Sequence, residues 1–383
     1  MKINQEQFNN NKDEIYSTQA EYYMRECFDL ANKALGRTSP NPIVGAVVLD
    51  KNGFPAGKGF HKASGAEHAE VTAIKEAGEK AKGGTLIVNL EPCCHQGKTP
   101  PCTDLIIKSQ ICEVIFSCYD PNPLVNKKGE EILIKNNIKV LSRVLESEGI
   151  ELNKFFFKWV KSKLPWVTLK QAQTLDGKIA LSNKQSKWIT GDLARKEVHK
   201  MRNIYDAILV GARTVEIDNP YLTVRDVDNS RNPVRIVVDL NLITQPDSNI
   251  YKNDSVVYLV TKTEHKKDKL NNYLKFNSEL KFIQLPEISK GKISFQHLFE
   301  ELGKRNILSV LVEAGPSLAG ELVLDRLIDE YVLFIAPRIF GDEDALSSLK
   351  IGPLEKIQNS YEFNLFDYQA IGNDLMVSLR PKN

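Results

Sequence analysis

The sequence of 383 residues lacks any long hydrophobic run, and no apolar stretch approaches the roughly 20 residues that a membrane-spanning helix needs. Its first 19 residues, MKINQEQFNNNKDEIYSTQ, lack the apolar core of a secretory signal. The sequence also lacks a large excess of charge of one sign, because the formal net charge is only +2. No strong field therefore attracts the protein to nucleic acid or to a membrane. We expect a cytoplasmic protein that binds neither.

Cysteine is scarce as well. Six cysteines in a chain of this length do not indicate a disulfide-stapled secreted domain. The hydrophobic content of 42% and the charged content of 26% are typical of a globular protein. The length favours two or more domains, and we find no internal repeat.

The first half of the chain alternates short, β-branched apolar runs with helical patterns. The runs predict strands at 43–49, 85–90, 113–118 and 138–141. The apolar spacing predicts helices at 24–35, 66–84, 102–109 and 129–137. Strands that alternate with helices predict an α/β sheet covered on both faces.

The pattern loosens between residues 143 and 164, where an aromatic-rich helix is expected to end before Pro165. We therefore divide the chain into a polar N-terminal arm (1–19), a first domain (20–145), a linker (146–164) and a second domain (165–383). The second domain has strand candidates at 166–173, 207–211, 234–239, 256–261, 309–314 and 331–336, and helix candidates at 192–203 and 316–327. The polar segment 263–276 is expected to be a solvated helix face. No G-x-G-x-x-G follows the first strand of this domain, so a Rossmann fold gets little support.

The stretch EPCCHQGKTPPC (91–102) concentrates cysteine, histidine and proline. Zinc takes about four ligands in a tetrahedral array, and a catalytic site keeps one position for water. Cys93 and Cys102 can supply two thiolates, and His68 of the upstream triplet HAE is the candidate for the third ligand. Glu70 is then placed to move protons for a water that the metal activates. H-x-E followed by P-C and a second cysteine is the arrangement of zinc deaminases that act on nucleobases.

Two features of this stretch leave alternatives open. A purely structural zinc site would use Cys93, Cys94, His95 and Cys102, and would leave Glu70 without a role. The second cysteine also arrives after eight intervening residues, whereas nucleobase deaminases usually have two. The extended loop offers His95, Lys98 and Thr99 to an anionic substrate.

These residues resemble the bifunctional riboflavin-biosynthesis deaminase/reductase family, often called RibD. The matching stretches of the first half are TSPNPIVGAVV (38–48), GKGFHKASGAEHAE (57–70), NLEPCCHQGKTPPCTDLI (89–106) and YDPNPLV (119–125). Those of the second half are TLDGKIA (174–180), SKWITG (186–191), ARKEVHKMRNIYDAILVGARTVEIDNPYLTVR (194–225) and LVEAGPSLAG (311–320). The resemblance runs from about residue 20 to the C-terminus. It implies an N-terminal cytidine-deaminase-like α/β/α domain of three layers and a C-terminal dihydrofolate-reductase-like α/β domain.

The resemblance implies that the first domain deaminates 2,5-diamino-6-ribosylamino-4(3H)-pyrimidinone 5′-phosphate by hydrolysis. His68, Cys93 and Cys102 then correspond to the zinc ligands and Glu70 to the proton donor. Asn41 corresponds to a substrate-binding residue whose amide offers both a donor and an acceptor. Cys94 occupies a position that tolerates other small residues, so we do not count it as a ligand.

The resemblance implies that the second domain uses NADPH to reduce the ribosyl group to a ribityl chain, giving 5-amino-6-ribitylamino-uracil 5′-phosphate. The implied substrate contacts are Ser186, Arg202, Leu222, Arg225 and Glu313. The implied cofactor contacts are Ala172, Trp188, Thr214, Asp218, Gly315, Pro316, Ser317, Leu318, Ala319, Gly320 and Glu321. The two arginines are suited to clamp a phosphate, and the turn GPSLAGE fits a helix N-terminus that favours phosphate. The family tends to self-associate, so we expect a homo-oligomer.

Three positions depart from the family pattern: Ala314 and Lys127 replace the usual glycine, and Thr174 replaces a common serine. None of them removes an expected ligand or the proton donor. The alternative hypothesis is a nucleic-acid or nucleoside base deaminase with an accessory binding domain, which predicts a basic groove and a short P-C-x-x-C loop. A non-catalytic, zinc-stabilised interaction protein would be insensitive to Glu70→Gln. The low net charge and the long loop favour the two-step enzyme.

Overall fold

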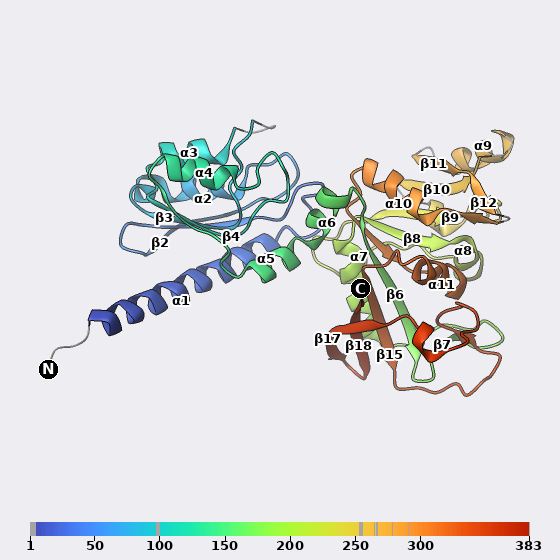
Figure 1. Ribbon diagram of the computed structural model, residues 1–383. Helices are drawn as coiled ribbons and strands as arrows, with labels where there is room; N and C mark the ends of the chain where they lie inside the picture. Colours follow the sequence, from blue (N-terminus) through green and yellow to red (C-terminus); the bar gives the residue numbers. More distant parts are fainter. Residues whose placement is uncertain are drawn as a thin grey trace. The chain divides into compact units, whose positions relative to one another are not determined.

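The computed structural model describes residues 5–96, 100–252, 256–263, 265, 267–277, 279–289 and 291–382. The chain divides into two compact units, Met1–Lys163 and Leu164–Asn383 (Figure 1). Most of the segment expected as a polar arm belongs to helix α1 (Gln5–Asn32). The segment expected as a linker contains two helices, α5 (Glu146–Leu152) and α6 (Lys154–Ser162).

The N-terminal unit is built on a sheet of five strands in the order β2-β1-β3-β4-β5. The strands are β1 (Gly45–Leu49), β2 (Pro55–Phe60), β3 (Thr85–Leu90), β4 (Glu113–Cys118) and β5 (Lys139–Leu141). β1 runs antiparallel to β2 and β3, whereas β3, β4 and β5 are parallel to one another. The carboxyl ends of three neighbouring strands therefore meet at one edge of the sheet, the usual place for a ligand site in such folds.

Helices cover both faces of this sheet. On one face, α1 and α5 pack against it, and Met24, Cys27 and Phe28 are buried there. The other face is covered by α2 (Ala69–Ala77), α3 (Cys102–Lys108) and α4 (Lys128–Lys135). The predicted three-layer α/β/α arrangement is thus confirmed, as are the expected strands at 85–90 and 113–118.

One local prediction for this unit needs correction, and one strand was missed. The helix expected at 66–84 is shorter, because Gly78 adopts a φ of 55° that ends α2, and a 3-10 turn (Gly78–Ala81) follows. β2 was not predicted, because its sequence PAGKGF has no β-branched residue. Its glycines have another role, since a Cβ on Gly57 would lie 2.2 Å from Ala73 O and one on Gly59 would lie 2.4 Å from Ala69 O. The missing side chains let α2 lie directly on β2 and so fix the start of α2.

The C-terminal unit contains a sheet of nine strands in the order β11-β10-β9-β8-β14-β6-β15-β18-β17. These strands are β6 (Trp166–Thr174), β8 (Ala207–Gly211), β9 (Val234–Val238), β10 (Val257–Lys262), β11 (Leu280–Leu285), β14 (Ser309–Val312), β15 (Glu330–Ala336), β17 (Phe363–Ile371) and β18 (Asp374–Pro381). The strands from β11 to β15 are parallel, and the hairpin β17–β18 adds an antiparallel edge. Short pairs are formed by β12 (Glu287–Ser289) with β13 (Lys292–Ile293), and by β7 (Lys178–Ala180) with β16 (Leu346–Ser347).

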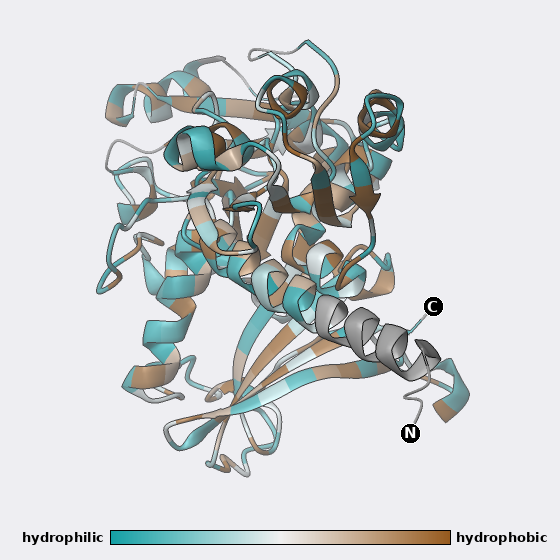
Figure 2. Cartoon of the chain, turned by 90° about the vertical axis from the view of Figure 1, so that its left-hand side faces the viewer, coloured by the Kyte–Doolittle hydropathy of each residue, from teal (hydrophilic) through white to brown (hydrophobic). Residues whose placement is uncertain are grey.

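The helices of this unit are α7 (Asp192–Ile204), α8 (Ala212–Asp218), α9 (Lys267–Phe276), α10 (Phe295–Lys304) and α11 (Pro316–Leu324). α10 and α11 bury Phe299 and Leu322 against one face of the sheet, and α7 buries Val198 against Phe334 of β15. Figure 2 shows that the helices of the chain carry hydrophilic (teal) as well as hydrophobic (brown) residues, as expected for helices with one buried side. Strands were predicted for β6, β8, β9, β10, β14 and β15 and are confirmed, with ends that differ by up to two residues. The hairpin β17–β18 was missed.

Among the described residues, no helix combines the length and the apolar character that a membrane span requires.

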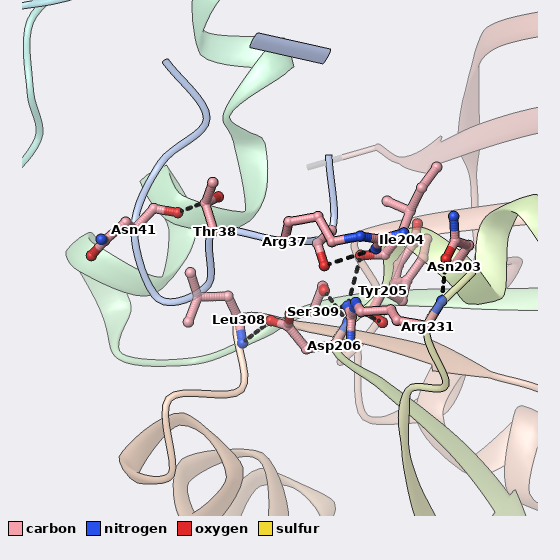
Figure 3. A network of polar contacts seen from close by, with 11 residues as sticks. Arg37, Thr38, Asn41, Asn203, Ile204, Tyr205, Asp206, Arg231, Leu308 and Ser309 are labelled. Atoms are coloured by element: carbon pink, nitrogen blue, oxygen red, sulfur yellow. Dashed lines mark hydrogen bonds and ion pairs between the residues drawn. The ribbon is translucent and has the colours of Figure 1, made fainter. Parts of the chain in front are cut away.

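A buried carboxylate ties three segments of the C-terminal unit together (Figure 3). Asp206, which precedes β8, accepts a hydrogen bond from Leu308 N at 2.8 Å, and its own N–H donates to Ser309 Oγ at 2.9 Å. Arg231 Nη2 lies 3.5 Å from the Asp206 carboxylate and donates to Tyr205 O at 2.8 Å. Asp206 is only 8% exposed. This network sets where β8 and β14 begin, and with them the loops at the opposite end of the sheet.

We expect Asp206→Ala to destabilise the C-terminal unit by about 1–3 kcal/mol, because it leaves the buried N–H of Leu308 without its acceptor and removes the carboxylate that faces Arg231. The urea-unfolding transition of that unit measures the change. Asp228→Ala removes an exposed carboxylate from a nearby turn and serves as the control. Equal midpoints for the two variants would contradict the role given to Asp206.

Candidate active sites

Three ligand-type side chains converge where the loop after β3 meets the start of α2. His68 is the N-cap residue of α2, Cys93 follows β3, and Cys102 is the first residue of α3. His68 Nδ1 lies 3.2 Å from Cys102 Sγ and 3.5 Å from Cys93 Sγ. The ligand atoms of the three residues all lie within 4.8 Å of one another.

This cluster fits a zinc ion. Bonds of about 2.0 and 2.3 Å from a tetrahedral zinc to nitrogen and sulfur place those two atoms roughly 3.5 Å apart, close to the distances found here. The pKa of the Cys93 thiol is lowered to about 4, first by a hydrogen bond from the Cys102 side chain and also by His68. A thiolate is the form of cysteine that binds a metal. Three ligands from the protein leave the fourth position of a tetrahedron for water.

Glu70 stands next to this cluster, in the first turn of α2. It is 4% exposed, and burial raises the pKa of its carboxyl, as does the charge of Cys93. His68 and a hydrogen bond with the Cys102 side chain oppose that rise. A carboxyl whose pKa moves toward neutrality beside a metal cluster is suited to take up and release a proton.

Asn41 is held by a histidine that we did not single out in the sequence, His61. The ring Nδ1 of His61 lies 3.0 Å from Glu67 O, so Nδ1 must carry the proton and donate it. Nε2 is then an acceptor, and it receives a hydrogen bond from Asn41 Nδ2 at 3.2 Å. Burial lowers the pKa of His61, which keeps the ring in this neutral form. The amide of Asn41 is therefore held in one orientation.

The rest of the extended loop is placed only in part. His95 Nδ1 is buried and has no hydrogen-bond partner among the described residues, so it can receive one from a ligand. Lys98 and Thr99 lie outside the described residues. Cys94 is not part of the metal cluster, and its thiol is 3.7 Å from Leu124 O. The structural zinc site with Cys94 and His95 as ligands gets no support from this arrangement.

The C-terminal unit contains a cavity of about 1120 Å³ at the carboxyl ends of its parallel strands. Ten of the expected contact residues line it: Ala172, Ser186, Thr214, Asp218, Glu313, Gly315, Pro316, Ser317, Leu318 and Glu321. The other six are Trp188, Arg202, Leu222, Arg225, Ala319 and Gly320, and they do not line it. Trp188 is 60% exposed beneath the guanidinium of Arg195, and Leu222 is 6% exposed with a φ of 51°. Ala319 and Gly320 are buried within α11.

A largely buried ionic cluster includes Lys170 and Glu313, which line this cavity, and Arg202 next to them. Arg202 Nε and Nη2 donate to the two carboxylate oxygens of Glu313 at 2.6 and 2.9 Å. Lys170 Nζ lies 3.7 Å from the same carboxylate. Burial alone would raise the pKa of Glu313, but Arg202 and Lys170 outweigh it and lower the pKa to about 2. Lys170 was missed, although a lone lysine within the apolar strand 166–173 was a signal for it.

The start of α11 fits a phosphate-bearing cofactor. Gly315 is the N-cap residue and Pro316 follows it, and no described side chain caps this end. The first N–H groups of a helix carry partial positive charge and bind phosphate well. Because Gly315, Ser317 and Leu318 line the cavity, these groups face a space large enough for a dinucleotide.

Comparison with known proteins adds two family assignments. A profile described as "RibD C-terminal domain" matches residues 165–377. A profile described as "Cytidine and deoxycytidylate deaminase zinc-binding region" matches residues 17–118. The second match includes His68, Glu70, Cys93 and Cys102.

Relatives cover nearly the whole chain. "Riboflavin biosynthesis protein RibD" of Aquifex aeolicus is 40% identical over 357 residues, which are 93% of this chain and 96% of the relative. The protein of the same name from Escherichia coli is 36% identical over 373 residues, which are 94% and 99% of the two chains. Among solved structures, Acinetobacter baumannii RibD has a TM-score of 0.86 at 33% identity, covering 96% of this chain and 100% of that one. A Thermotoga maritima structure titled diaminohydroxyphosphoribosylaminopyrimidine deaminase/5-amino-6-(5-phosphoribosylamino)uracil reductase has a TM-score of 0.85 at 38% identity, with the same coverage.

The depressed pKa of Glu313 predicts a pH dependence of stability. The pKa of this carboxyl is about 2 in the folded unit and 4.5 in an unfolded chain, so its ion pairs stabilise the fold fully above pH 4.5. We expect the stability of the wild type relative to Glu313→Gln to fall as the pH drops from 4.5 to about 2, and to stay constant at higher pH. Urea unfolding of both proteins across this range measures the difference. If the difference in stability did not change between these pH values, Arg202 and Lys170 would not lower the pKa of Glu313.

Proposed function

The chain belongs to the RibD family of bifunctional deaminase/reductase enzymes of riboflavin biosynthesis, and on this premise we propose which residues carry out each reaction. The zinc-binding deaminase domain lies in the N-terminal unit and the reductase domain in the C-terminal unit. The substrate of the first reaction is 2,5-diamino-6-ribosylamino-4(3H)-pyrimidinone 5′-phosphate, which loses an amino group as ammonia. The second reaction reduces the ribosyl group of the product to a ribityl chain.

For deamination, His68, Cys93 and Cys102 hold the zinc. When bound, the metal supplies the Lewis acidity that makes water a nucleophile near neutral pH. Glu70 takes a proton from the attacking water and passes it to the departing amino group, so that the C–N bond is replaced by a C–O bond and ammonia leaves. Asn41, oriented by His61, binds the pyrimidinone ring with its free donor and acceptor. The observation that carries this proposal is the convergence of the three ligands beside a buried carboxyl.

For reduction, NADPH supplies the hydride. We propose that the N–H groups at the start of α11 bind a phosphate of the cofactor, and that Thr214 and Asp218 contact the cofactor from the facing helix α8. Arg202 is already paired with Glu313, so its contribution is to hold that carboxylate in place at the cavity wall. Arg225, whose side chain is exposed, is then the arginine suited to bind the substrate phosphate.

The nucleic-acid deaminase hypothesis needs an accessory binding domain, and the match to a RibD C-terminal domain occupies that part of the chain. We also propose that the protein self-associates. β17 is the last strand of the sheet and exposes Leu365, Phe366 and Tyr368, a surface that favours burial against another chain. All six cysteines are free thiols, which fits the cytoplasmic location that we propose.

Glu70→Gln tests the deaminase mechanism. We expect the variant to keep its zinc and to lose deamination by about 10²–10⁴-fold, because the amide cannot accept and return a proton. Ammonia release, zinc content by elemental analysis and reduction of the separately supplied deaminated substrate are the measurements. Glu79→Gln, at an exposed position beyond α2, is the control for loss of a carboxylate. Persisting ammonia release in Glu70→Gln would show that the role given to Glu70 is wrong.

Arg225→Ala tests the phosphate site of the reductase. We expect the phosphorylated substrate to bind more weakly by about 1.5–3 kcal/mol, the range for hydrogen bonds to charged groups. Titration calorimetry with the phosphorylated substrate and its dephosphorylated analogue measures this, and the analogue should bind both proteins equally. Arg326→Ala removes another exposed arginine as a control. An unchanged preference for the phosphorylated form would exclude Arg225 from the phosphate site.

A further inference from the structure

One buried carboxylate at the edge of the deaminase sheet has no role in the mechanism above. Glu91 follows β3, is 3% exposed, and its N–H donates to Cys118 O of β4 at 2.9 Å. β3 and β4 are parallel, with Leu90 paired to Cys118. The segment 91–96 follows β3 and contains Cys93, and we call it the zinc loop; it therefore leaves the sheet beside the segment that follows β4.

Glu91 accepts hydrogen bonds from both ends of the segment 119–127, which we call the β4–α4 loop, and from the first turn of α4. Oε2 accepts from Asp120 N at 3.4 Å, where the loop begins, and from Lys127 N at 3.0 Å, where it ends. Oε1 accepts from Glu130 N at 3.3 Å, in the first turn of α4. Lys127 is the N-cap residue of α4, and its own side chain does not cap the helix. Glu91, which follows β3 and is far from α4 in the sequence, caps the helix by accepting from Lys127 N and Glu130 N.

The β4–α4 loop is also in contact with the zinc loop. A Cβ on Gly129 would lie 2.4 Å from Pro92 O, so the start of α4 touches the residue between Glu91 and Cys93. In the middle of the loop, Leu124 O is 3.7 Å from the thiol of Cys94. The loop thus runs alongside the segment that carries the zinc ligand Cys93.

We propose that Glu91 is a positioning residue for deamination, whose carboxylate holds the β4–α4 loop against the zinc loop so that this loop forms one wall of the pyrimidine site. The inference rests on the deaminase function proposed above. Glu91 acts through the backbone that it binds, since its oxygens face N–H groups, and it transfers no proton. It determines how well the substrate is bound and leaves the chemistry at the metal to Glu70.

Glutamate is specific for this position. Glutamine has one acceptor oxygen, and its NH₂ group would point at backbone N–H groups that are themselves donors. Aspartate is shorter by one methylene, so it would hold its carboxylate farther from these N–H groups. Glu91→Gln is therefore the sharpest test, because it keeps the size of the side chain and removes one acceptor.

The experiment measures KM and kcat for ammonia release by full-length, zinc-loaded Glu91→Gln, with the diaminopyrimidinone ribosyl phosphate as substrate. We expect KM to rise about tenfold or more, as for the loss of a buried hydrogen-bond acceptor, with a smaller change in kcat. Zinc content and reduction of the deaminated substrate should equal those of the wild type. Glu131→Gln is the matched control, since Glu131 is exposed in the same first turn of α4 and should leave KM unchanged.

Three outcomes would overturn the proposal: an unchanged KM, a loss of activity that parallels a loss of zinc, or a fall in kcat alone. Gly129→Ala tests the same contact from the opposite side, because its methyl group would press the start of α4 away from Pro92 and Glu91. It should raise KM as Glu91→Gln does. If the wild type itself releases no ammonia, the deaminase function fails; if it does and both variants match it, only the role of Glu91 fails.

Discussion

The convergence of one histidine and two cysteines is the constraint on which the N-terminal unit depends. The three ligand atoms lie within 4.8 Å of one another, although His68 and Cys102 are 34 residues apart in the sequence. Cys93 is fixed by the end of β3, Cys102 by the start of α3, and His68 by the start of α2. The position of α2 depends in turn on Gly57 and Gly59, which let it lie on β2 without intervening side chains. The position of His68 in the metal cluster therefore depends on the close packing of α2 on β2.

The two sites shift the pKa of a glutamate in opposite directions. In the deaminase, burial and a neighbouring thiolate raise the pKa of Glu70, so the carboxyl can exchange protons. In the reductase, Arg202 and Lys170 lower the pKa of Glu313 and keep it ionised. Two largely buried glutamates are therefore in opposite electrostatic states. We propose that Glu70 carries a proton during deamination, whereas Glu313 is a fixed negative charge that pairs with Arg202 and Lys170.

Much of this could be predicted from the sequence where a single local pattern decides the outcome. Strands 85–90 and 113–118 are runs of β-branched and apolar residues, and the order HAE, strand, P-C and second cysteine predicts the cluster of His68, Cys93 and Cys102 that the structure brings together. β2 could not be predicted, because its glycines serve packing rather than strand propensity. Contacts between residues far apart in the sequence could not be predicted either. Nothing in the spacing of Arg202 and Glu313, or of Glu91 and Lys127, shows that the fold brings them together.

Two separate active sites in one chain therefore act in order, deamination first and reduction second. The most direct test supplies the diaminopyrimidinone ribosyl phosphate with and without NADPH, and follows ammonia release and nicotinamide absorbance in the same sample. We expect ammonia release in both samples and oxidation of NADPH only after deamination has begun. The absence of ammonia release by zinc-loaded protein, or oxidation of NADPH without deamination, would contradict the account.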